Sequence, residues 1–184
     1  MIDLADIAQR LRRVTVEVTD AGQALGCGVL WPPGWIVTNA HVVRRPHATV
    51  WLVDGRRLDG ALVARDAEAD LALLRLAGAG MPTAPVAGPD SARVGALVVA
   101  IGHPLGVRGA VTAGIIHAIA PMVPGGPACI LADMRLAPGN SGGPLADAAG
   151  RVLGLNAMVV GRLALAIPMT RVRSFVRAAG VEGV

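Results

Sequence analysis

The stretch Pro138-Gly139-Asn140-Ser141-Gly142-Gly143-Pro144 is the most informative part of this sequence of 184 residues. A serine that attacks a carbonyl carbon needs backbone N–H groups that converge on the developing oxyanion, and it needs room for the substrate. Glycine meets both needs because it has no Cβ atom and adopts left-handed backbone conformations. The same residue types also build ordinary turns, so the stretch alone leaves a catalytic and a structural interpretation open.

The order of the histidines and the serine excludes one class of hydrolase. Residues 139–143 also fit the G-x-S-x-G pattern of α/β-hydrolases, in which the catalytic histidine follows the serine. All four histidines of this chain precede Ser141, at positions His41, His47, His103 and His117. The order that remains, histidine, aspartate and then serine, is that of the chymotrypsin-like double β-barrels.

Two further residues are candidates to form a triad with the serine. His41 follows Trp35-Ile36-Val37-Thr38, which is typical of a buried strand, so we expect it at a rigid and accessible strand end. Asp70 directly precedes the apolar run Leu71–Leu76, where a carboxylate needs a partner. The one rival acid is Asp133, which we expect to support the serine loop. The other histidines and acids considered are interpreted as turn, strand or solvated residues: His47, His103, His117, Asp54, Asp59, Asp66 and Glu68.

Three blocks of the sequence resemble the catalytic blocks of the HtrA (DegP-like) serine proteases: Thr38-Asn39-Ala40-His41-Val42-Val43, Asp70-Leu71-Ala72-Leu73-Leu74 and Pro138–Leu145. The resemblance extends over roughly residues 24–178. It implies an all-β fold of two six-stranded antiparallel Greek-key β-barrels, as in trypsin, with short N- and C-terminal helices. It also implies a serine endopeptidase of protein quality control, which cuts unfolded or flexible polypeptides through an acyl-enzyme.

The resemblance also implies roles for particular residues. His41, Asp70 and Ser141 would be the triad, and the backbone N–H groups of Gly139 and Ser141 would form the oxyanion hole. No metal or organic cofactor is expected. Arg135 either turns away from the specificity pocket toward a partner such as Asp133 or selects acidic residues, and we expect the first. The pocket is expected to accept a small aliphatic residue and to be lined by Leu136, Asn156, Ala157, Met158, Ala164 and Leu165.

Composition and pattern agree with one domain built from short strands. Hydrophobic residues make up 53% of the chain and charged residues 16%, yet no apolar run approaches the roughly 18 residues of a membrane span. We expect an N-terminal barrel at about 14–80, a linker at about 81–92, a C-terminal barrel at about 93–168 and a helix at about 169–179. Two helices are expected to present apolar faces to these barrels: Leu4, Ile7, Ala8 and Leu11 after the cap Asp3, and Val172, Phe175, Val176 and Ala179 before Gly180.

The remaining features concern partners, redox state and compartment. The net charge of +4 comes from scattered arginines, since the sequence has no lysine, and no aromatic residues lie between them to stack bases, so nucleic acid is not expected as a partner. Cys27 and Cys129 lie in different predicted barrels and are expected to be free thiols, with a disulfide bridge left open.

A catalytically silent, peptide-binding pseudo-protease is the alternative function. The chain shows no recognisable signal peptide and no PDZ module, so a cytoplasmic location is expected, or an exported one if the sequence is trimmed. The oligomeric state is left open.

Overall fold

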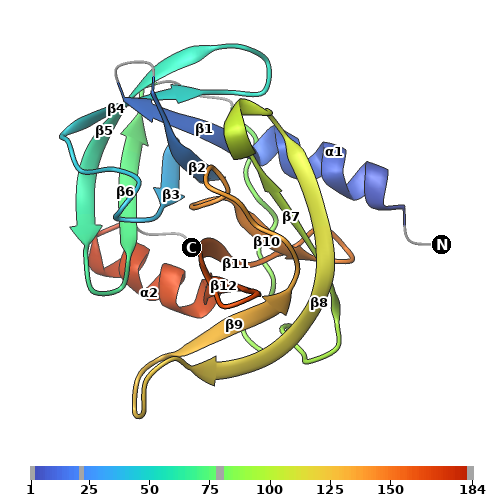
Figure 1. Ribbon diagram of the computed structural model, residues 1–184. Coiled ribbons are helices and arrows are strands. Elements are labelled where there is room, and N and C mark those ends of the chain that lie inside the picture. Colours follow the sequence, from blue (N-terminus) through green and yellow to red (C-terminus); the bar gives the residue numbers. More distant parts are fainter. Residues whose placement is uncertain (1–2, 21–22, 78–80, 182–184) are drawn as a thin grey trace.

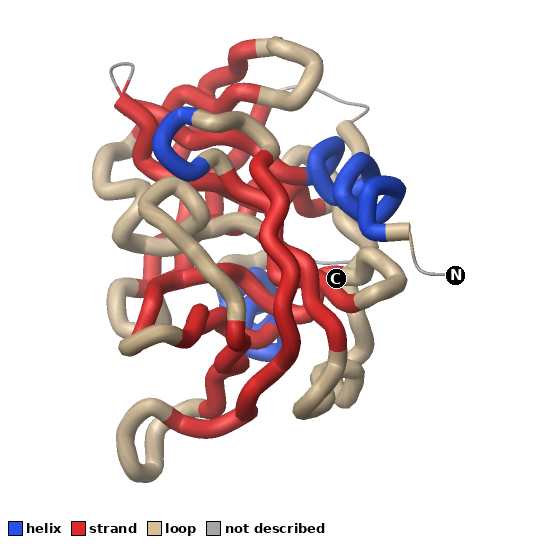
Figure 2. Tube along the Cα trace, turned by 45° about the vertical axis from the view of Figure 1, so that its right-hand side comes forward, coloured by secondary structure: helices blue, strands red, loops and turns tan. Residues whose placement is uncertain are grey.

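Two closed β-barrels of six antiparallel strands make up most of residues 3–20, 23–77 and 81–181, which the computed structural model describes (Figure 1). The predicted all-β, chymotrypsin-like class is therefore confirmed. Strands dominate because the sequence offers many short runs of Val, Leu, Ile and Ala separated by Gly and Pro, which suit pleated, half-buried surfaces. Figure 2 shows how little of the trace is helical.

The first barrel closes in the strand order β1-β2-β3-β6-β5-β4. Two of its strands, β3 and β6, are almost entirely buried, with every residue of β3 buried and only Arg75 of β6 exposed. That explains why these two strands appear in the sequence as mainly apolar runs, interrupted in β6 by Arg75, instead of alternating ones. The strands of this barrel are β1 (Thr15–Asp20), β2 (Gln23–Trp31), β3 (Trp35–Thr38), β4 (His47–Trp51), β5 (Arg57–Asp66) and β6 (Leu71–Leu76).

The second barrel closes in the order β10-β11-β12-β9-β8-β7. A short 3₁₀ turn, η1 (Pro104–Gly106), lies between its first two strands. The hairpin of β8 and β9 is the longest ribbon of the molecule and reaches beyond the rest of the barrel (Figure 1). The strands are β7 (Leu97–Gly102), β8 (Ala110–Pro121), β9 (Ala128–Asp133), β10 (Pro144–Asp147), β11 (Val152–Val160) and β12 (Leu163–Pro168).

Two α-helices flank the barrels, as the sequence patterns predict. The carboxylate of Asp3 accepts the N–H of Ala5 at 2.8 Å and so caps α1 (Leu4–Val14), whose buried residues are Ile7, Ala8, Leu11 and Val14. Leu4 was expected on that face and is instead 38% exposed, because the first turn extends beyond the barrel surface. The closing helix α2 (Met169–Ala178) buries Met169, Val172 and Val176 and is followed by Gly180 with φ of +80°.

The segment between the barrels is bonded to both of them. Ala84 N–H donates to the carbonyl of Leu30 in the first barrel at 3.1 Å, and Val152 N–H in the second barrel donates to the carbonyl of Pro85 at 2.7 Å. One continuous apolar cluster also contains residues of both barrels and of both helices. The two barrels therefore have a fixed relative position, which any site built from both of them requires.

Candidate active site

His41 lies in a tight turn directly after β3. Val42 N–H donates to the carbonyl of Asn39 at 3.1 Å, which closes the turn. The buried side chain of Asn39 donates from Nδ2 to the carbonyl of Asp70 at 3.0 Å. Because β3 pairs with β6, the end of β3 and the start of β6 lie side by side, and Asn39 fixes the spacing between them.

Asp70 lies at the start of β6 and contacts His41 through both carboxylate oxygens. Nδ1 of His41 lies 2.9 Å from Oδ2 and 3.0 Å from Oδ1, and the backbone N–H of His41 donates to Oδ1 at 3.0 Å. Three contacts from one carboxylate fix both the orientation of the ring and the nitrogen that carries its proton. Asp70 has φ of +53°, a conformation that non-glycine residues adopt at a cost and that is common at functional sites.

The other acidic candidates have partners of their own, away from His41. Asp66 accepts the N–H groups of Glu68 and Ala69 in the preceding turn, Asp54 pairs with Arg56, and Asp59 pairs with His47. The exposed carboxyl of Asp54 has a lowered pKa, chiefly because the backbone N–H of Arg56 donates to it. Asp133, the rival from the sequence, ends β9 in the second barrel. Of the predicted acids, the structure brings Asp70 to His41.

The serine loop, residues 138–144, enters the barrel interface through close backbone contacts. Ser141 C=O accepts the N–H of Cys27 at 2.7 Å, and Gly142 N–H donates to the carbonyl of Asn156 at 2.8 Å. Gly142 has φ of +81°, and a Cβ there would collide with the carbonyl oxygen of Cys27 and the hydroxyl of Thr38. The glycine is therefore required by the approach of β2 from the first barrel, which a sequence pattern cannot show.

The Ser141 hydroxyl does not bond to His41 in this structure. Its Oγ donates to the carbonyl of Ala157 in β11 at 3.0 Å. The backbone N–H groups of Gly139 and Ser141 donate to no backbone carbonyl of the described residues. Gly139 has φ of +102°, and its own carbonyl accepts bonds from His103 N–H at 3.1 Å and Cys27 Sγ at 2.9 Å. The loop thus carries a serine and two backbone donors available to a ligand.

A pocket of about 360 Å³ opens beside Ser141. Four of the predicted wall residues line it, namely Leu136, Asn156, Ala157 and Met158. Ala164 and Leu165 do not, and this part of the prediction is corrected. They pair with Val159 and Met158 across β11 and β12 but are only 2% and 5% exposed, because their side chains belong to the apolar core. The additional lining comes from the serine loop and β11: Ala137, Pro138, Asn140, Ser141 and Val159.

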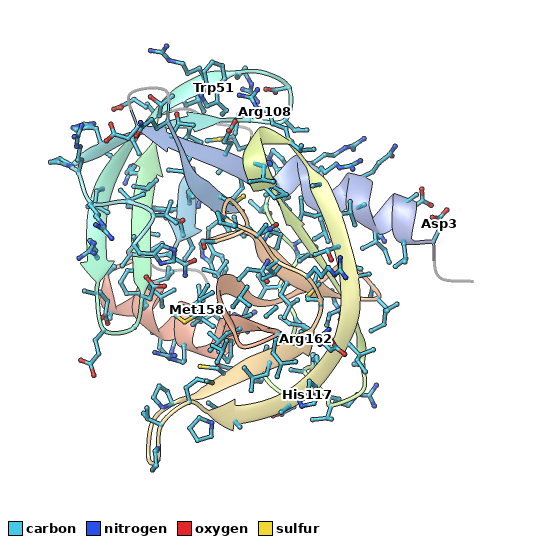
Figure 3. All side chains as sticks on the ribbon, viewed as in Figure 1. Asp3, Trp51, Arg108, His117, Met158 and Arg162 are labelled. Atoms are coloured by element: carbon cyan, nitrogen blue, oxygen red, sulfur yellow. The ribbon has the colours of Figure 1, made fainter. Side chains whose placement is uncertain are left out.

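Arg135 does not line this pocket. It borders an adjoining hollow of about 500 Å³, together with Asp133 and Arg162 (Arg162 is labelled in Figure 3), and this hollow shares Leu136, Ala137, Asn140 and Val159 with the pocket. No ion pair forms between Arg135 and Asp133 in the described part of the chain.

Two residues beside the serine loop went unrecognised in the sequence. Cys27 was interpreted only as a free buried thiol, and it is free and buried, but its Sγ–H also holds the Gly139 carbonyl. Burial raises the pKa of Cys27 to about 12, so the thiol stays protonated and can donate. His103 was interpreted as a turn residue, and its backbone binds the same carbonyl. The glycines on both sides of Cys27 were the available signal, because they indicate a close backbone approach.

No metal centre or membrane helix emerges from the described residues. They contain no group of three or more His, Cys, Asp or Glu side chains arranged to hold a metal ion. Neither described helix combines the length and the apolar character needed to cross a membrane.

Comparison with known proteins assigns this chain to a family. The family model of the trypsin-like peptidase domain matches residues 26–155, and the chain belongs to that family. Within it, the chain is similar to DegP-like proteases, as the three sequence blocks predict. The "Probable periplasmic serine endoprotease DegP-like" of Ectopseudomonas mendocina is 38% identical over 157 residues, which cover 80% of this chain and 33% of the relative. The protein of the same name from Halomonas elongata has the same identity and coverage.

Solved structures give the same result. The chain is similar to "HtrA-type protease AlgW with decapeptide", with a TM-score of 0.90, 27% identity, and coverage of 99% of this chain and 69% of that one. A second structure, "HtrA-type protease AlgW with tripeptide", has a TM-score of 0.88 at 31% identity and covers 96% and 63%. The chain spans a third of the length of the DegP-like relatives.

Proposed function

We propose that this domain is a serine endopeptidase in which Ser141 is the nucleophile, His41 the general base and acid, and Asp70 the residue that orients and stabilises the imidazole. The observation that carries the proposal is the double contact of the Asp70 carboxylate with Nδ1 of His41 at 2.9 and 3.0 Å. A carboxylate on Nδ1 places the ring proton there and leaves Nε2 free to accept the serine proton. Family membership supports the same assignment.

In this mechanism Ser141 attacks the peptide carbonyl carbon while His41 takes its proton. The same imidazole then protonates the leaving amine, and water hydrolyses the acyl-enzyme. We assign the oxyanion hole to the N–H groups of Gly139 and Ser141, which bond to no backbone carbonyl of the described residues. Each donor of this kind typically contributes about 2.7 to 4 kcal/mol to transition-state stabilisation.

The Ser141 hydroxyl must leave the carbonyl of Ala157 before it can attack. A neutral hydrogen bond of this kind has a net value of about 0.5 to 1.5 kcal/mol, so breaking it reduces the reactive population by about two- to tenfold. That cost is small compared with a catalytic acceleration of many orders of magnitude. Catalytic hydrogen bonds are often unformed in ligand-free structures.

We propose that the pocket beside Ser141 binds the residue on the acyl side of the cut and favours small aliphatic side chains. Its walls are mainly Leu136, Ala157, Met158 and Val159, and no charged residue lines it. Polypeptides are therefore the proposed substrates. Mass spectrometry of fragments from a denatured protein checks this, because cleavage mainly after acidic or basic residues contradicts an apolar pocket.

The relatives are named as periplasmic proteins, which favours an exported location of this protein over a cytoplasmic one.

The decisive experiment compares the parent protein with Ser141→Ala. Loss of the nucleophile is expected to lower turnover of unfolded casein by about 10⁴- to 10⁶-fold while the protein stays folded. A fluorophosphonate probe should label the parent and not the variant. One observation favours the silent alternative, namely the Ser141 bond to Ala157. If the parent binds peptides but neither cleaves casein nor reacts with the probe, the pseudo-protease interpretation replaces the peptidase.

A further inference from the structure

The loop from His103 to Gly109 supports the peptide that we assign to the oxyanion hole. Leu105 N–H approaches the carbonyl of Pro138 at 3.4 Å, and His103 N–H donates to the carbonyl of Gly139 at 3.1 Å. In a trans peptide the C=O and N–H groups point in opposite directions. A Pro138 carbonyl held by Leu105 therefore turns the Gly139 N–H to the opposite side, where a ligand can accept it.

This supporting loop has a strained backbone. The strain lies at Leu105, which has φ of +53° although it is not glycine. A left-handed conformation costs a residue with a side chain about 1 to 2 kcal/mol. The Leu105 side chain is 86% exposed, so its own packing does not offset that cost. Contacts elsewhere must hold the loop in this shape.

The buried ring of His103 supplies one of these contacts. Its Nδ1 accepts the N–H of Gly109 at 2.9 Å and so ties the two ends of the loop together. His103 is only 7% exposed. An imidazole nitrogen can accept a hydrogen bond only when it carries no proton, so this contact requires the neutral ring with its proton on Nε2. A protonated ring would point Nδ1–H at the Gly109 N–H.

The far end of the loop is anchored to the first barrel and to α1. Arg108 Nε donates to the nearly buried carboxylate of Glu17 in β1 at 2.7 Å, and its guanidinium lies 5.1 Å from the ring centre of Trp51 in β4 (Figure 3). Arg12 of α1 donates from Nε to the carbonyl of Gly109 at 2.7 Å. Because Gly109 is fixed by Arg12, its bond to His103 determines where the other end of the loop lies.

Three charged groups and one neutral thiol surround His103. Arg12 of α1, Glu17 of β1 and Arg108 of the loop line the same small cavity as the His103 ring, and the neutral thiol of Cys27 in β2 lies beside its backbone N–H. Burial lowers the pKa of His103 below its ordinary value of 6.5. A hydrogen bond with the backbone of Gly102 and the carboxylate of Glu17 oppose this shift, and Arg108 adds to it. The structure therefore favours the neutral ring that the Gly109 bond requires.

We propose that His103 is a positioning residue for the oxyanion hole: its neutral ring holds the 103–109 loop against Pro138 and Gly139, and its protonation releases that support. The inference rests on the proposed peptidase function. It predicts that two protonations lower activity as the pH falls, one at the general base and one at His103 in the loop that supports the oxyanion hole.

The test compares the parent with His103→Asn and His103→Ala. An asparagine Oδ1 can accept the Gly109 N–H but does not titrate, whereas alanine accepts nothing. We expect His103→Ala to lower kcat at pH 8 by about 10- to 100-fold, with KM changed by less than about threefold, because the oxyanion hole acts mainly in the transition state. His103→Asn should recover most of that loss.

The pH profile separates a positioning role from a merely structural one. From pH 8 down to about pH 4.5, one protonation lowers kcat by about tenfold per pH unit and two protonations by up to about hundredfold. As the pH falls, kcat of the parent is expected to decrease first with the slope of one protonation and then with the slope of two. His103→Asn is expected to keep the slope of one protonation throughout. His117→Asn is the matched control, because His117 lies exposed on β8 (Figure 3), and it should retain the parent profile.

Two results would overturn the inference: an acid limb of His103→Asn that coincides with the parent limb, or an unchanged kcat in folded His103→Ala. If His103→Ala does not fold, the comparison of His103→Asn with the parent decides alone. A parent without Ser141-dependent turnover at pH 8 overturns the proposed function, and this inference with it.

Discussion

Replacement of Asp70 by asparagine is expected to inactivate the enzyme without unfolding it. Oδ1 of Asp70 accepts the backbone N–H of His41 at 3.0 Å, and only the amide oxygen of an asparagine can do so. The amide nitrogen then takes the place of Oδ2, 2.9 Å from Nδ1 of His41. Since an NH₂ group only donates, Nδ1 must become the acceptor and the ring proton moves to Nε2. The ring then cannot accept the serine proton.

The expected loss follows from that change of tautomer. A general base in the wrong tautomer typically costs about 10⁴-fold in kcat, which corresponds to about 5.4 kcal/mol at 1.36 kcal/mol per factor of ten. The backbone should tolerate the change, because asparagine is among the residues that best adopt the φ of +53° seen at Asp70. Asp70→Ala is less suitable for this test, because alanine adopts a positive φ less readily than asparagine.

The assay is kcat on a fluorogenic peptide at pH 8, with folding checked by circular dichroism and the unfolding temperature. Asp66→Asn is the matched control, since among the described residues Asp66 accepts only the N–H groups of Glu68 and Ala69 in the neighbouring turn, and it should keep the parent rate. A folded Asp70→Asn protein that retains a tenth or more of the parent kcat would refute the assignment of Asp70.

Two further predictions concern the contacts between β2 and the serine loop. Burial raises the pKa of Cys27 to about 12, above the ordinary thiol value, so its stabilising contribution is complete below about pH 8.5 and is lost as the pH rises toward 12. The chain has no lysine or tyrosine to titrate in this range. From pH 9 to pH 11 the unfolding temperature should therefore fall more in the parent than in Cys27→Ser. Equal decreases in the two proteins would contradict the raised pKa of Cys27. Gly142→Ala should lower the free energy of unfolding by at least about 2 kcal/mol, and the unfolding temperature by at least about 4 °C, because φ is +81° and the added Cβ meets the Cys27 carbonyl. A variant with the parent's unfolding temperature would show that the loop can move away.

Much of this protein could be predicted from residues that are close together in the sequence. The glycine-framed serine, the histidine at the end of an apolar run and the aspartate at the start of another one indicated the family, because each block is a short run of neighbouring residues that can be recognised without the fold. The helix cap at Asp3 and the apolar face of α2 are local in the same way, since they depend on residues three or four positions apart. Periodicity at this range is visible without any knowledge of the fold.

The tertiary structure decided whatever depends on residues that meet across the barrels. Cys27 and Gly139 are 112 positions apart, and Glu17 and Arg108 are 91 apart, so no spacing in the sequence indicated either contact. The hydroxyl of Ser141 bonds to Ala157, and Ala164 and Leu165 turn into the core instead of the pocket. Side-chain direction in a closed barrel depends on strand register and on what packs inside, and both are set only when distant segments come together. The sequence therefore determined which residues are available for the proposed triad, and the packing of the two barrels determined which neighbours hold them in place.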